Sequence, residues 1–149
     1  MLFPTLPLDS KVWIYQSDRE LSDSEASYLY KELTDFVKKW AAHGTQLFGD
    51  VMIVSNRFVI LVVDETNTGV SGCSIDTSVQ KIKELGANLD VDFFNRMNLY
   101  IENNGTFKLV HISELKEYTN WTVFNPMVST LKELRNNWKI PVTQSNFLN

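Results

Sequence analysis

The order of the elements that the sequence predicts is that of an α+β fold, a ferredoxin-like βαββαβ sandwich with an added hairpin strand and a C-terminal helix. Three observations support this expectation. A capping-box pattern opens a long amphipathic helix soon after the first strand. The unbroken apolar run Phe58–Val63 is typical of a central strand. The pair Asn104-Gly105 strongly favours a tight hairpin turn. A mixed sheet with another strand order is the main alternative.

The first half of the chain predicts one strand, one helix and a hairpin. Residues 11–16 are rich in β-branched and aromatic side chains, which indicates a strand. Ser22 should cap the helix, and Gly44 is a natural residue to follow its end. Two strands should follow, at 47–54 and 58–64. Helical spacing puts five apolar side chains of the helix on one stripe: Leu29, Leu33, Phe36, Val37 and Trp40.

A second helix is predicted at 74–85. Ser74 or Asp76 could cap its N-terminus, and Gly86 could end it. Its inward-facing residues should be Ile75, Val79, Ile82 and Leu85.

The last third should contain a second hairpin and a final helix. A two-residue turn at Asn104-Gly105 pairs Leu99 with Val110 across strands at 97–103 and 106–112. A short helix should follow from Ser113. The final helix is then expected to start at an Asn125-Pro126 cap and to end before Pro141. We expect one domain over residues 1–149, in which residues 1–10 form a loosely held N-terminal arm.

The βαββαβ plan would bring two groups of polar residues to opposite edges of the sheet. One edge would carry the end of the first helix, the end of the third strand and the start of the second helix. The other would carry the end of the first strand, the hairpin turn and the start of the fourth strand. The first group comprises His43, Asp64, Glu65, Cys73 and Ser74, and the second comprises Asp18, Arg19, Asn56, Arg57, Asp90, Asp92, Asn95 and Arg96.

The first group contains the components of thiol chemistry. Cys73 precedes the expected helix, and a helix N-terminus lowers the pKa of a thiol. His43 could serve as its base, with Asp64 or Glu65 orienting the imidazole. The plainer interpretation is that a lone cysteine is a small buried apolar residue and that His43 marks a helix end.

The second group contains three arginines, in positions where their guanidinium groups could bind carboxylates or phosphates in a bidentate manner. The candidate ligand-binding residues are Arg19, Arg57, Arg96, Asn56 and Asn95. The alternative is that neighbouring aspartates satisfy the arginines in surface ion pairs, which contribute little to stability.

Composition restricts the functions that the chain can have. Fourteen basic residues against 18 acidic ones give a net charge of −4, and no basic run indicates nucleic-acid binding. A single cysteine excludes an intramolecular disulfide and a multi-cysteine zinc site. We expect no cofactor. The absence of a signal-peptide pattern and of a long apolar run predicts a cytoplasmic protein without a membrane partner. Its expected partner is an anionic small molecule or a protein, and self-association as a homodimer is consistent with such a sheet.

Several short stretches carry a resemblance to a known family. They are Asn56-Arg57-Phe58, Asp64-Glu65, Ser71–Asp76 and Asp92–Arg96. Over about Lys11 to Tyr100 the sequence resembles a family of small bacterial proteins of uncharacterised function that are often labelled "ABC transporter ATPase". The residues do not support this label, because the chain has no Gly-x-x-x-x-Gly-Lys-Ser/Thr motif to hold nucleotide phosphates. The resemblance therefore transfers no functional residue. Our sequence-based interpretation is a binding or interaction module, and the alternative is a small thiol-dependent enzyme that uses Cys73 with His43.

Overall fold

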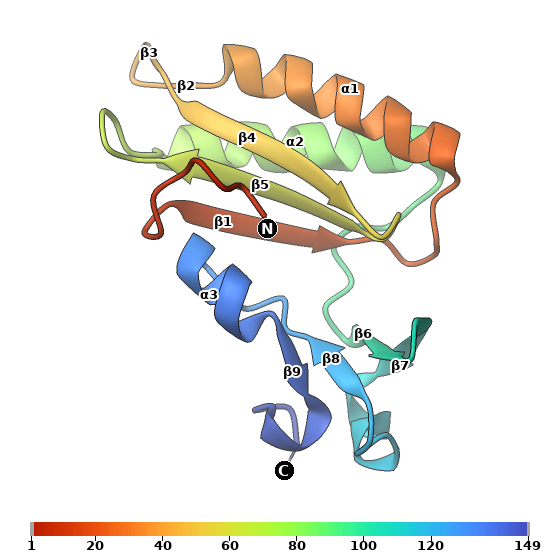
Figure 1. The fold of residues 1–149 in the computed structure, drawn as a ribbon. Coiled ribbons are helices and arrows are strands. Elements are labelled where there is room, and N and C mark those ends of the chain that lie inside the picture. The colour runs from red at the N-terminus through yellow and green to blue at the C-terminus, as the bar shows by residue number, and fades with distance from the viewer. Residues whose placement is uncertain (1, 149) are drawn as a thin grey trace.

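The protein is an α+β fold of helices and antiparallel sheets, seen in a computed structural model that describes residues 2–148 (Figure 1). Two helices cover one face of a sheet, and the C-terminal part of the chain lies beyond its other face (Figure 1). The elements are β1 (Lys11–Gln16), α1 (Asp23–Lys39), β2 (Ala41–Ala42), β3 (Thr45–Gln46), β4 (Phe48–Val54), β5 (Phe58–Asp64), α2 (Gly72–Leu89), β6 (Asn98–Asn103), β7 (Thr106–His111), β8 (Thr122–Phe124), α3 (Leu131–Asn137) and β9 (Lys139–Pro141), with short 3-10 helices at Ile112–Glu117 and Val142–Gln144.

The first sheet has the strand order β1-β5-β4, and β5 is antiparallel to both neighbours. Ile60 at its centre lies opposite Ile14 on one side and Met52 on the other. Each side chain from Phe58 to Val63 is at most 1% exposed. The expectation of a central strand is confirmed, because a strand that is covered on both faces needs no polar alternation.

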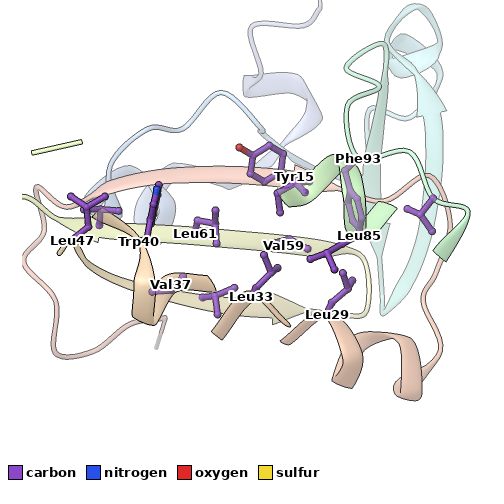
Figure 2. Packing of buried hydrophobic residues seen from close by; sticks show 14 of the residues in the cluster. Tyr15, Leu29, Leu33, Val37, Trp40, Leu47, Val59, Leu61, Leu85 and Phe93 are labelled. Atoms are coloured by element: carbon purple, nitrogen blue, oxygen red, sulfur yellow. The ribbon is translucent and has the colours of Figure 1, made fainter. Parts of the chain in front are cut away.

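Helices α1 and α2 bury their apolar stripes against one face of this sheet (Figure 2). Leu29, Leu33 and Val37 of α1 are buried as the helical spacing predicts. Ser22 caps α1 in a complete capping box with Glu25. In α2 the buried stripe is only partly as predicted: Ile82 and Leu85 are buried, Ile75 and Val79 are half-buried, and Ser74 and Ser78 are buried in their place.

The opposite face of the first sheet packs on α3 and the second sheet. Ile14 and Ile60 of the sheet share a core with Leu131, Leu134 and Trp138. The C-terminal helix therefore covers this face. The N-terminal arm also joins this core, since Phe3 is 2% exposed and the backbone carbonyls of residues 2 and 3 accept hydrogen bonds from Arg135. The arm is therefore attached to the core at residues 2 and 3, and the expectation that it is loosely held stays a prediction; residue 1 lies outside the described chain.

The second sheet has the order β7-β6-β8-β9. Leu99 lies opposite Val110, as the Asn104-Gly105 turn predicts, and both turn residues have positive φ. However, β6 does not pair with β1. The free edge of β1 is instead bonded by the segment before α3, where Val12 N donates to Ser129 O at 3.0 Å. The βαββα part matches the expected order, and the complete ferredoxin-like topology is not confirmed.

Five predicted helix boundaries differ from the structure. One is the start of the short 3-10 helix, which is capped by His111 and not by Ser113. His43 and Gly44 do not end α1; both have positive φ and form the turn between β2 and β3. Helix α2 is capped by Ser71. It also continues past Gly86 to Leu89, so a glycine inside a helix was mistaken for its end.

The final helix starts later than expected. Thr130 is the N-cap of α3, and its side chain accepts a hydrogen bond from Glu133 N. Asn125 instead accepts a hydrogen bond from Met127 N in a preceding turn, and the Met127 side chain is exposed. The prediction failed because a capping pattern and an asparagine turn use the same residue types.

Candidate functional site

The first predicted group lies on one edge of the molecule. The β2–β3 turn, the end of β5 and the start of α2 are all on the left side of Figure 1. Trp40, which follows α1, donates a hydrogen bond from Nε1 to Ser74 O at 2.8 Å and so ties the end of α1 to the start of α2. The topology therefore places these segments as expected.

The polar side chains of this edge are engaged with their own loop rather than with one another. Asp64 accepts hydrogen bonds from the side chain and backbone N–H of Thr66, which lower the pKa of its carboxyl group. Glu65 accepts a hydrogen bond from Val70 N at 3.0 Å. Cys73 and His43 are both exposed, and no hydrogen bond joins their side chains within residues 2–148. The plainer interpretation of a buried cysteine is wrong, and the proposed catalytic roles stay predictions.

The second predicted group also assembles at one edge, at the end of β1. Ser17 N donates to Arg57 O at 2.8 Å, and Asp92 N donates to Asp18 Oδ1 at 3.2 Å. The Gln16 side chain donates to Asn98 O and so connects this edge to the second sheet. Residues distant in sequence therefore meet at this edge, although β6 does not pair with β1.

Arg19 is held by an ion pair within the chain. Its two terminal nitrogens contact the Glu25 carboxylate at 2.9 and 2.7 Å, and one of them also donates to Leu89 O. The hydrogen bonds from Arg19 and from Ser22 N lower the pKa of Glu25 to about 2. This arrangement caps α1 and joins it to the end of α2, so the ion-pair interpretation applies to Arg19.

Arg57 and Asn56 are likewise occupied by neighbouring groups. The Arg57 guanidinium carbon lies 4.1 Å from the centroid of Phe107, and its Nη2 is 3.2 Å from Glu20. This stacking fixes the first hairpin on the second sheet. Asn56 donates its amide to Asp23 at 2.8 Å.

Arg96 differs from the other two arginines. It is exposed, and no ion pair to it occurs among residues 2–148. Burial raises the pKa of Tyr15, and the nearby charge of Arg96 opposes that shift. The Tyr15 ring packs edge-to-face on Phe94, with centroids 5.5 Å apart.

A lysine completes this cationic surface, and sequence reasoning missed it. Lys83 Nζ lies 5.6 Å from the centroid of the half-buried Phe94 ring. Lys83 is on the face of α2 that the loop at 90–97 crosses, and this tertiary contact leaves no local sequence signal. Asn95 accepts a hydrogen bond from Met97 N with its Oδ1 at 2.9 Å, and among the described residues no hydrogen bond from its amide NH₂ occurs. We call Lys83, Phe94, Asn95 and Arg96 the cationic loop surface.

Comparisons with models of known protein families, with curated proteins and with solved structures returned no significant match. The family resemblance of the sequence therefore stays a prediction. Within residues 2–148, no helix combines the length and apolarity that crossing a bilayer requires. The same residues contain no cluster of three or more His, Cys, Asp or Glu side chains arranged to hold a metal ion.

Proposed function

We propose that this protein is a cytoplasmic binding module that recognises an anionic ligand or partner at the cationic loop surface. The observation that carries the proposal is the contrast between the arginines. Arg19 and Arg57 have carboxylate partners within the chain, whereas Arg96 is exposed and is without one among the described residues. Of the ligand-binding residues expected from the sequence, we therefore keep Arg96 and Asn95. We add Lys83 to them.

The chemistry of this surface fits a carboxylate or phosphate. A guanidinium group presents paired N–H donors to two anion oxygens, and an ammonium group adds a second charge. The Asn95 amide adjoins Arg96 and supplies a neutral donor. Phe94 offers an apolar contact beside Lys83, so an anion with an apolar or aromatic part should bind better than inorganic phosphate.

The β1–α1–β4–β5–α2 unit supports the placement of this surface. Its strand order is that of a ferredoxin-like sheet, and we infer that it is such a sheet whose fourth strand has moved into the second sheet. The loop at 90–97 crosses between the two parts of the molecule and is anchored at Asp18. A surface anchored in this way can bind a ligand without first becoming ordered.

A thermal-shift screen against phosphate, citrate and benzoate tests the proposal. At least one anion should raise the melting temperature of the native chain. Arg96→Ala should abolish that rise and Lys83→Ala should reduce it, while Lys116→Ala, which removes an exposed lysine from a 3-10 helix, should leave it unchanged. Equal stabilisation of the native chain and Arg96→Ala would refute the assignment.

The thiol-dependent enzyme stays a second candidate because Cys73 is exposed in the first turn of α2. Helix N-termini favour the thiolate form. The rate of alkylation by iodoacetamide, measured against pH, tests it in the native chain and in His43→Ala. The enzyme is supported if the pH midpoint of alkylation in the native chain lies well below that of a free thiol and if this midpoint rises in His43→Ala. A midpoint at the ordinary value excludes it.

A further inference from the structure

The outer strand of the first sheet, β4, has an unpaired edge in the described chain. It pairs with β5 on one side, and no other strand among residues 2–148 pairs with it. Ser17 N donates a hydrogen bond to Arg57 O, and along an antiparallel strand the backbone N–H and C=O groups of successive residues point to alternate sides. The backbone groups of Phe58, Ile60 and Val62 therefore point toward β4, and those of the residues between them point toward β1. It follows that the backbone groups of Gly49, Val51 and Ile53 face outward.

Apolar side chains flank this edge on both faces of the sheet. On the helix face a groove of about 540 Å³ runs between α1 and β4, beside the half-exposed ring of Tyr30. On the other face Phe48 is 58% exposed. That face also has a groove of about 490 Å³, which is lined by Val54, Leu2 and Trp138 among others. Unpaired strands with apolar flanks are surfaces on which another strand can add.

We propose that β4 pairs antiparallel with β4 of a second copy of this chain, with Val51 on the two-fold axis. This would join two three-stranded sheets into one continuous sheet. The proposal concerns a surface separate from the cationic loop surface and does not depend on the ligand proposed there.

The shape of the edge favours this register. The outward-facing residues of the two strands must lie opposite one another. Near the middle of β4 this allows the two-fold axis to pass through Asp50, Val51 or Met52. A centre at Asp50 would place two like-charged carboxylates directly opposite, which is destabilising. A centre at Met52 would place Phe48 opposite the turn at Asn56 rather than opposite a strand.

The centre at Val51 places Ile53 opposite Gly49. Val37 and Trp40 of the same copy already fill the helix face at Gly49, so the register depends on the pair formed by Phe48 and Val54. This centre also places exposed Phe48 opposite Val54 of the other copy, at the mouth of the groove, whose lining combines Leu2 and Trp138 with the polar residues Arg135, Asn136 and Lys139. Cross-strand partners have their Cβ atoms within about 5.5 Å, so this phenylalanine can cover the groove.

Asp50 opposes this pairing and so sets its strength. Its Oδ1 accepts a hydrogen bond from Val51 N at 2.8 Å and thereby occupies a central outward N–H of the edge. Pairing of the two strands requires this hydrogen bond to be exchanged for one to Val51 O of the other copy. Replacement of Asp50 by alanine frees the donor and removes the charge, and should therefore tighten the dimer.

Sedimentation equilibrium of the full chain over a wide concentration range tests the proposal. The native chain should dimerise reversibly. Phe48→Lys should weaken the dimer roughly tenfold or more, because it removes the burial of one phenyl ring per copy. Asp50→Ala should tighten it. Met97→Lys is a matched control, because Met97 is 56% exposed and lies outside the β4 edge. A monomer at every concentration, or a dimer equally weakened by Phe48→Lys and Met97→Lys, would overturn the proposal.

Disulfide cross-linking tests the register in a Cys73→Ser background. Asp50→Cys combined with Met52→Cys should form a covalent dimer on mild oxidation, since these positions lie opposite each other and Phe48 is retained. In Met52→Cys alone, the two introduced cysteines lie opposite each other only if Met52 is on the two-fold axis. This variant should therefore cross-link more slowly than the double-cysteine variant. Faster cross-linking of Met52→Cys would refute the Val51-centred register. Circular dichroism should confirm that each variant is folded.

Discussion

Replacement of Gly86 by alanine should destabilise the protein even though Gly86 lies inside a helix. Alanine in place of a helical glycine is ordinarily favourable by about 0.5–1 kcal/mol. Here a Cβ would lie 2.6 Å from Val91 O and 3.2 Å from Cδ2 of Phe93. The carbonyl of Val91 cannot easily move away, because Val91 N is bonded to Gly86 O at 2.8 Å. Overpacking of this kind costs about 1–3 kcal/mol, so we expect the free energy of unfolding to fall by about 1–2 kcal/mol.

Urea denaturation followed by circular dichroism measures this change. Gly72→Ala is the matched control, because Gly72 is also in α2 and its Cβ would meet nothing within 4 Å. That variant should be unchanged or more stable by about 0.4–1 kcal/mol. If Gly86→Ala were as stable as Gly72→Ala, the loop that starts at Val91 would not pack on α2. The placement of the cationic loop surface would then be wrong.

Two further predictions concern residues that join the elements. The pKa of Glu25 is lowered to about 2 in the folded chain, so the stability that its carboxylate contributes is fully present above its ordinary pKa and is lost as the pH falls through about 2. In urea denaturation at a series of acidic pH values, Glu25→Gln should therefore lose less stability over this range than the native chain. An unchanged pH dependence would count against the Arg19 ion pair. Trp40→Phe removes the buried hydrogen bond to Ser74 O and should reduce the free energy of unfolding by about 1–3 kcal/mol while speeding alkylation of Cys73, because the first turn of α2 loses its tie to α1. Unchanged alkylation would show that this hydrogen bond does not hold the turn.

Local patterns predicted the strands and the first helix well, because burial imposes period and composition directly. Phe58–Val63 is apolar on both faces, and the Ser22–Glu25 capping box uses only residues within one turn. The Asn104-Gly105 pair even gave the correct register, since a two-residue turn leaves no freedom in strand pairing.

The pairing of β6 could not be predicted in this way. Its sequence suits a covered strand in either sheet, and the choice depends on which segment reaches the open edge of β1. The stretch before α3 occupies that edge through Ser129, far along the chain. Sequence separation leaves no local signal of such competition, so the complete ferredoxin-like plan was favoured from too little evidence.

The candidate sites show the same division. The topology correctly brought Asp18 and Asp92 together at one edge. It could not tell that Arg19 and Arg57 are held by Glu25 and Glu20, because side-chain pairing depends on rotamers and on distances of a few ångströms. The Asp50 carboxylate on the β4 edge was missed for the same reason.

An NMR titration that follows the Nε–Hε signals of the arginine side chains tests the central functional claim most directly. On addition of benzoate or phosphate, we predict a saturable shift of the Arg96 signal, with backbone shifts over residues 92–97 and little change at Arg19 or Arg57. Saturable shifts at Arg19 and Arg57 with an unchanged Arg96 signal, or no saturable shift at any arginine, would contradict the account.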